Sequence, residues 1–241
     1  MTWAMGGLLG FDLETTGPDP TTALPVSFAL SWWDFDIEQR SRYGLINPGV
    51  PIPPESTEIH GITDAMVADA TRAGTLERSV TGIAGLIMSA VHDGFAVVGC
   101  NVVYDITIMD RLLREFGDPA GLYEDNWYGR VIDVLVMDRH IDPYRRGSRN
   151  LSALCNTYGV KLPNAHHAGG DARAAVGVAR AIAAKSKEIA SMDLDLLHVS
   201  QASWRRTWAK EFSEYRVKKG QEPLEESEGD WPVKGRKGVS L

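Results

Sequence analysis

The chain has 241 residues, 44% hydrophobic and 24% charged, a balance typical of globular proteins that excludes collagen-like, disordered and disulfide-stabilised classes. Its formal net charge of −7 disfavours a protein that coats nucleic acid with basic charge, but it allows a catalyst that engages a few phosphates through bound cations. Two cysteines without a C-x-x-C pair, and a first apolar stretch (Met5–Phe11) too short to span a bilayer, predict a cytoplasmic protein with reduced thiols and no membrane association.

Alternating apolar residues predict strands in the first part of the chain. Leu8–Glu14 places Phe11 and Leu13 on one face and Asp12 and Glu14 on the other. Four further strands are expected at Val26–Trp32, Arg42–Ile46, Phe95–Gly99 and Val131–Ile132.

Apolar residues at three- and four-residue spacings predict helices in the second part. These helices cover Leu76–Val91, a segment that begins near Asp105, Leu151–Tyr158 and Asp171–Ile189, and a Pro-rich loop at Pro51–Pro54 precedes the first of them. Strands first and strand–helix alternation later indicate an α/β domain over residues 5–190.

An aromatic stripe follows the predicted domain. Trp204, Trp208, Phe212 and Tyr215 are spaced for one face of a helix over residues 191–217. Packing of this face on the domain is favoured over an interaction surface. From Lys218 the composition predicts a mobile tail, residues 218–241, with Trp231-Pro232 as a docking point.

Asp12 and Glu14 lie two residues apart on the first strand, so their carboxylates project from the same face and can clamp one divalent cation. The alternative is an exposed pair at a strand edge that is simply solvated. Thr15, Thr16 and Gly17 follow directly, and such small residues let a ligand approach the end of the strand closely.

Asp105 and Asp171 each stand at the expected start of a helix. Either could be a helix cap or a favourable charge on the helix dipole. Together with Asp12 and Glu14, however, they place four acids near element ends of one α/β sheet, where ligands collect. A cluster of carboxylates at such an edge indicates bound cations.

Four segments, in chain order, resemble the motifs of the DEDD family of 3′–5′ exonucleases, in its DnaQ-like proofreading branch. They are Phe11–Gly17, His60–Thr63, Asn101–Asp105 and His166–Asp171. Together they are specific, whereas one alone would be weak. The second motif departs from the family pattern at Cys100, where histidine is usual, and at Tyr104, where phenylalanine is usual. The Trp-rich helix and the Trp-Pro tail also resemble the extension of the proofreading epsilon-subunit-like exonucleases of actinobacteria or their phages.

The resemblance implies a ribonuclease H-like fold: a mixed five-stranded sheet flanked by helices, with a C-terminal helical extension. It implies two divalent ions, Mg²⁺ or Mn²⁺, one held by Asp12, Glu14 and Asp171 and a second bridged by Asp12 and supported by Asp105. The implied reaction removes nucleoside monophosphates from DNA 3′ ends in replication or repair. A DNA polymerase or replisome component is then the expected partner.

Two histidines compete for the role of general base. His166, five residues before Asp171, matches the histidine branch of the family and is the one we favour. His167 stands four residues before it, at a spacing that a tyrosine occupies in the sister branch. It would share a helix face with Asp171, but Gly169 and Gly170 indicate a loop there.

Five residues are candidates for holding the terminal nucleotide. His60 and Ile62 suit stacking against a base, although His60 could equally cap a helix. Thr15, Thr16 and Asn101 can donate or accept hydrogen bonds.

The run from Arg139 to Arg149 is the most basic stretch near the motifs, and it is interpreted either as a phosphate track or as a solvated loop. Two rival functions also remain. One is a 3′–5′ exoribonuclease or oligoribonuclease on the same fold, since a few pocket groups sense the 2′-hydroxyl. The other is a non-catalytic module that binds a polymerase or a DNA end, which the presence of all four acids disfavours.

Overall fold

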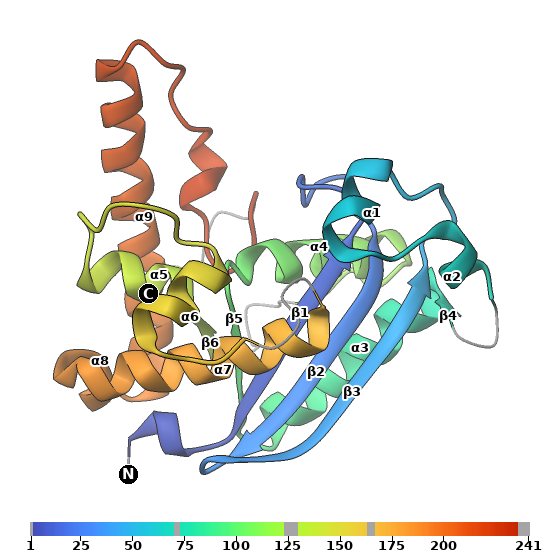
Figure 1. Ribbon diagram of the computed structural model, residues 1–241, viewed down its shortest axis with the longest axis horizontal. Coiled ribbons are helices and arrows are strands. Elements are labelled where there is room, and N and C mark those ends of the chain that lie inside the picture. The colour runs from blue at the N-terminus through green and yellow to red at the C-terminus, as the bar shows by residue number, and fades with distance from the viewer. Residues whose placement is uncertain (1, 70–72, 123–129, 163–166, 236–241) are drawn as a thin grey trace.

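The computed structural model describes residues 2–69, 73–122, 130–162 and 167–235. Its centre is a mixed sheet with the strand order β4-β3-β2-β1-β5-β6 (Figure 1). The strands are β1 (Leu8–Thr15), β2 (Pro25–Asp34), β3 (Ile37–Asn47), β4 (Ala73–Thr75), β5 (Ala96–Gly99) and β6 (Val131–Asp133). β2 runs antiparallel to β1 and β3, whereas the β1–β5, β5–β6 and β3–β4 pairs are parallel.

The mixed α/β sheet is as expected, but it has six described strands rather than five. The additional strand, β4, has three residues, too few to produce an alternating pattern.

Helices cover both faces of the sheet. They are α1 (Pro54–His60), α2 (Asp64–Ala68), α3 (Leu76–His92), α4 (Val103–Glu115), α5 (Val134–Ile141), α6 (Leu151–Tyr158), α7 (Ala168–Lys185), α8 (Lys187–Ser191) and α9 (Leu194–Lys218), with 3-10 turns η1 (Trp3–Met5) and η2 (Glu226–Gly229). The short helices α1, α2 and α5 were not expected. None of the helices in the described ranges is long and apolar enough to cross a membrane.

Alternation along β1 divides the core into two layers. Leu9, Phe11 and Leu13 point into the larger hydrophobic cluster beneath α3 and α4. Leu8 points the other way, into a second cluster that includes the buried face of α7. Asp12 and Glu14 share the face of Leu8, so they lie on the side of the sheet that α7 covers.

Gly10 on β1 lets α7 lie directly against the sheet. A Cβ at this position would stand 2.4 Å from the carbonyl oxygen of Ala172 and 3.1 Å from a methyl group of Val176. Ala29 on β2 meets Ala168 and Ala172 in a small buried cluster. Small residues on both sides thus bring the first turns of α7 close to β1 and β2.

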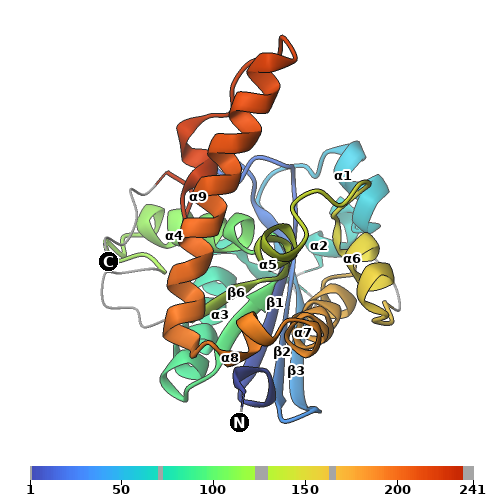
Figure 2. The same cartoon turned by 90° about the vertical axis from the view of Figure 1, so that its left-hand side faces the viewer.

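α9 packs on the domain through its first half and projects beyond it with its second (Figure 2). Leu197 and Gln201 are buried, and Gln201 hydrogen-bonds the β6 backbone through Asp133 N at 2.8 Å and Val131 O at 2.9 Å. Trp204 stacks on His140 of α5, with ring centroids 3.8 Å apart. The expected packing of this helix on the domain is therefore observed in its first half.

The segment after α9 differs from the mobile tail expected over residues 218–241. Its described part, to residue 235, returns to the domain, where Trp231 and Val233 are buried in the core. Lys234 N donates to Thr107 Oγ1 at 2.9 Å. Two apolar side chains in a polar stretch anchor the segment, and Trp231 is the docking point that the sequence suggested. The division into a domain over 5–190 and an extension stays a prediction.

The close approach of α7 can be tested at Gly10. Gly10→Ala should lower the free energy of unfolding by about 1–3 kcal/mol, because the new methyl group overlaps backbone that cannot move cheaply. Gly82→Ala in α3 is the matched control, with nothing within 4 Å of the added Cβ, and should be neutral or stabilising. Urea unfolding measures both, and a Gly10→Ala protein as stable as wild type would contradict the packing described.

Candidate metal centre

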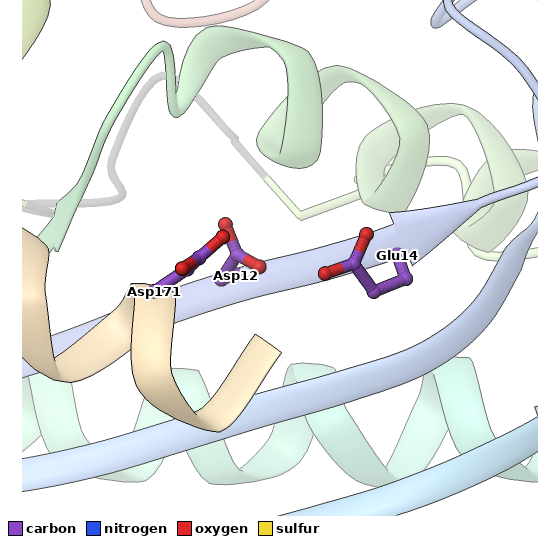
Figure 3. Close-up of side chains that lie close together, drawn as sticks. All are labelled: Asp12, Glu14 and Asp171. Carbon is purple, nitrogen blue, oxygen red and sulfur yellow. The ribbon is translucent and has the colours of Figure 1, made fainter. Parts of the chain in front are cut away.

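Three carboxylates converge where β1 passes under the start of α7. Asp12 and Glu14 project from β1, and Asp171 comes from the first turn of α7 (Figure 3). One oxygen from each of the three lies within 4.8 Å of the others. Oxygen ligands at this separation can surround a single hard cation such as Mg²⁺ or Mn²⁺.

The start of α7 places Asp171, and it differs from the expectation. Gly169 and Gly170 are not in a loop, because the helix begins at Ala168 and includes both. Ala168 and Gly170 are buried, and Ala168 packs with Ala29 of β2, so the first turn of α7 lies against the sheet. Packing outweighs the low helix propensity of glycine at this position.

Asp105 lies beside the three-carboxylate cluster. It occupies the first turn of α4 and is 5% exposed, and its Oδ1 accepts a hydrogen bond from Leu13 N at 3.1 Å. It is therefore attached to β1 between Asp12 and Glu14. Of the neighbouring charges that raise the pKa of Asp12, that of Asp105 has the largest effect.

The cluster is electrostatically unfavourable without a cation. Burial, followed by the charges of Asp105, Glu14 and Asp171, raises the pKa of Asp12 well above its usual range. Burial and then Asp171 raise the pKa of Glu14 to about 7. Among the described residues, the neighbouring charges that act on Asp12 and Glu14 are all carboxylates. This donor set fits a divalent cation, which would replace mutual repulsion by attraction.

The end of β1 is held against α4 by hydroxyl groups. Thr15 Oγ1 and the Tyr104 hydroxyl lie 2.5 Å apart, and Tyr104 also donates to Gly17 O. Thr16 Oγ1 accepts from Leu24 N at 3.0 Å, which joins the loop to the start of β2. Tyr104, where the family usually has phenylalanine, thus adds a polar contact that orders the loop beside Glu14.

A mostly apolar cavity of about 390 Å³ adjoins Glu14. Thr15, His60 and Tyr104 line it, as expected for Thr15 and His60, together with Ile59 of α1, which is 61% exposed. Ile62 is 4% exposed and packs in a separate cluster with Val26 and Ile52, because α1 turns at Gly61. The apolar wall of the cavity is therefore Ile59, whereas Ile62 lies in the core.

Asn101 is the other residue expected to contact substrate. It lies between β5 and α4 with a φ of 60°, a conformation that asparagine tolerates, and it is exposed. Its N donates to Asp133 Oδ1 at 2.9 Å, and Asp133 also caps α5. Asn101 lines a cavity that also contains Asp12 and Asp171, and another that also contains Tyr104 and Arg205.

His166, the favoured general base, lies outside the described residues. His167 is described: it is exposed, and its Nδ1 accepts from Gly169 N at 3.2 Å as the N-cap of α7. Its ring stacks on Tyr43 of β3, with centroids 4.6 Å apart.

A second cavity of about 540 Å³ contains Asp12 and Asp171. Arg139, Arg149, Arg205 and Trp208 also line it, and sequence reasoning singled out neither Arg205 nor a role for Trp208 at the site. The helical face that holds Leu197 and Gln201 continues to these two residues, so that spacing was the signal available.

Part of the basic run serves the fold. Arg145 and Arg149 bind the buried carboxylate of Asp138 at 2.8 and 2.5 Å. Only Arg139 and Arg149 of the run reach the second cavity.

Comparison with known proteins places these features in a family. The sequence profile described as Exonuclease (RNase_T) matches residues 9–179. A DNA polymerase III subunit epsilon-like protein of Rhodobacter capsulatus is 31% identical over 119 residues, which are 49% of this chain and 15% of that protein.

Solved structures of exonuclease I show the same fold. The enzyme from Methylocaldum szegediense aligns with a TM-score of 0.62 and 23% identity, over 87% of this chain and 46% of that one. E. coli exonuclease I in complex with a dA16 oligonucleotide aligns with a TM-score of 0.63 and 19% identity, over 83% of this chain and 44% of that one. The chain thus spans less than half the length of these relatives.

The raised pKa of Glu14 predicts how stability depends on pH in EDTA. The native pKa of about 7 exceeds the usual 4.5, so between these pH values the native state binds more protons than the unfolded state. The free energy of unfolding should therefore fall as the pH rises from 4.5 to about 7. Glu14→Gln should flatten this decline, whereas Glu58→Gln on exposed α1 should not. Saturating Mn²⁺ should also remove it in wild type, because the cation favours the charged form. Urea unfolding at several pH values measures the slope, and equal slopes in Glu14→Gln and wild type would count against the interpretation.

Proposed function

The chain belongs to the exonuclease (RNase_T) family, and we propose that it is a metal-dependent 3′–5′ exonuclease that removes nucleoside monophosphates from DNA 3′ ends. The convergence of Asp12, Glu14 and Asp171 between two cavities carries this proposal. A chain end bound in one cavity and a strand entering through the other would present one phosphodiester to the carboxylates.

In this proposal Asp12, Glu14 and Asp171 hold one divalent cation, and Asp12 and Asp105 support a second. Bound cations would supply Lewis acidity at the scissile phosphate and a more acidic attacking water. The support for Asp105 is its burial next to β1 and its effect on Asp12. Four carboxylates that repel one another in the free protein are matched to a total charge of about +4.

The cavity next to Glu14 suits the terminal nucleoside. Ile59 and His60 offer apolar and aromatic surface to the base, and Thr15 offers a hydroxyl. Tyr104 restricts Thr15 through their hydrogen bond, so the end of β1 is preorganised.

We propose His166 as the general base that accepts a proton from the attacking water. His167 is already engaged as the cap of α7 and in the stack on Tyr43, which supports the choice of its neighbour. Loss of His167 would instead disturb the start of α7, and with it the position of Asp171.

DNA is the proposed substrate, because E. coli exonuclease I was solved with DNA oligonucleotides; RNA remains the alternative. The epsilon-like relative suggests a replicative polymerase as partner and a cytoplasmic role in replication or repair. The polymerase partner and the cytoplasmic role are proposals, since the match covers only 15% of that relative.

Polarity and metal dependence can be tested together. Wild type with Mg²⁺ or Mn²⁺ should shorten a 5′-labelled single strand stepwise and release a 3′-terminal label at once as a mononucleotide. EDTA, Asp12→Ala or Asp171→Asn should lower the rate by at least about a thousandfold, because the interactions lost are worth several kcal/mol. Cleavage that resists EDTA, or a 5′ label released first, would refute the proposal. A ribonucleotide strand of the same sequence decides between DNA and RNA.

The base can be assigned by a pair of variants. His166→Ala should lower kcat by about 10²- to 10⁴-fold and abolish the acidic limb of the pH–rate profile. His167→Ala should keep that limb, because it disturbs a cap rather than proton transfer. If only His167→Ala removes the limb, His167 is the base.

A further inference from the structure

One wall of the cavity that contains Asp12 and Asp171 comes from the C-terminal extension. Arg205 and Trp208 of α9 line it, together with Arg139 of α5 and the two carboxylates. Both α9 residues lie outside the residues 9–179 that match the exonuclease family. The extension therefore takes part in the site and does not only cover the core.

Arg139 is held in one orientation by stacking. Its guanidinium carbon lies 3.6 Å from the centroid of the Trp208 ring. Trp208 in turn stacks on Phe212, with centroids 5.5 Å apart, and Phe212 stacks on Tyr215 at 6.2 Å. Three aromatic rings in a row therefore stand behind the Arg139 guanidinium.

A stacked guanidinium keeps its N–H donors in the ring-parallel plane, where they can bind an anion. Within the described part of the chain, Arg139 has no hydrogen-bond or ion-pair partner, unlike Arg149, which binds Asp138. Its donors are therefore available to a ligand in the cavity.

Arg205 adds a buried positive charge to the same wall. It is 5% exposed, and its Nε and Nη1 have no hydrogen-bond partner among the described residues. Its Nη2 lies 3.8 Å from Glu228, a long ion pair. Buried guanidinium donors without partners are costly, so an anion at this wall would stabilise them.

The acidic groups near this wall are partly engaged elsewhere. Glu228 binds Lys234 at 2.7 Å, and Asp133 Oδ1 accepts from Asn101 N and Leu135 N. Asp133 Oδ2 has no hydrogen-bond partner among the described residues, and the charge of Asp133 favours the charged forms of Arg139 and Arg205. Asp12 and Asp171 are the proposed cation ligands. Once cations neutralise Asp12 and Asp171, the three arginines that line the cavity outnumber its remaining acid, Glu228, so the cavity attracts an anion.

We propose that Arg139 and Arg205 form a subsite for the phosphodiester on the 5′ side of the one that is cut, with Trp208 as the positioning residue for Arg139. This inference rests on the proposed exonuclease function. The nucleoside cavity lies on the Glu14 side of the cluster and this cavity on the Asp12 and Asp171 side, so a strand that crosses the carboxylates continues towards α9. The subsite gives an acidic protein local basic charge where the strand enters.

The test compares two substrates in the full chain. Thymidine 5′-monophosphate p-nitrophenyl ester has a single phosphodiester and cannot reach the subsite, whereas a decathymidylate can. Arg139→Ala should raise the KM for decathymidylate about tenfold, which is the loss of one charge-assisted phosphate contact, and leave kcat/KM for the ester within about twofold. Arg206→Ala, an exposed neighbour on α9, is the matched control and should change neither.

Trp208 is tested by the split between KM and kcat. Trp208→Leu should raise the decathymidylate KM with kcat unchanged. Trp208→Phe should keep the KM near the wild-type value, because a smaller ring still supports the guanidinium. Arg205→Lys retains the charge opposite Asp133 and should raise the same KM. Unfolding midpoints of all variants identify any that are misfolded, and Arg139→Ala breaks no hydrogen bond between residues that the structure describes.

An unchanged decathymidylate KM in Arg139→Ala, or an equal loss on both substrates, would overturn the subsite. Wild type that cleaves neither substrate would contradict the proposed function itself, and the subsite with it. The two failures are therefore distinguishable.

Discussion

The packing of α7 on β1 is the contact on which the rest of the candidate site depends. Gly10 leaves room for the backbone at Ala172, and the next residue towards the helix start is Asp171. Its carboxylate therefore meets those of Asp12 and Glu14, although the three charges repel in a partly dry site. Core packing of α7 and β1 stabilises this arrangement, so the repulsion does not have to be relieved by movement. A fold that holds like charges together in this way is prepared for a cation.

The cluster lies between two cavities of different character. The one beside Glu14 is mostly apolar, with Ile59 and His60 on its wall, and the one beside Asp171 is lined by three arginines in addition to its carboxylates. This contrast suits a polymer whose terminal base enters the first and whose phosphates lie along the second. The net charge of −7 is then no obstacle, because positive charge is needed only where the strand passes. α9 supplies part of that charge through Arg205, which links the extension to the chemistry.

The sequence predicts the mixed sheet and the acids of the site because both depend on local signals. Alternation on β1 places Asp12 and Glu14 on one face, and motif order relates them to Asp105 and Asp171. The start of α7 could not be predicted in this way: Gly169 and Gly170 favour a loop by propensity, but contacts between distant segments, such as that of Ala168 with Ala29 of β2, hold this turn as helix against the sheet. The return of the chain after α9 was missed because two apolar residues, Trp231 and Val233, are too few to form a pattern. Arg205 was missed for a similar reason, since its role depends on a contact between distant segments.

The central claim, that the carboxylates form a divalent cation site, is tested most directly by anomalous diffraction from crystals soaked in MnCl₂. The account predicts a manganese peak bounded by Asp12, Glu14 and Asp171, and a second peak beside Asp12 on the side of Asp105. Crystals of Asp12→Asn should lose both. An empty cluster in wild-type crystals, with manganese bound only elsewhere, would contradict it.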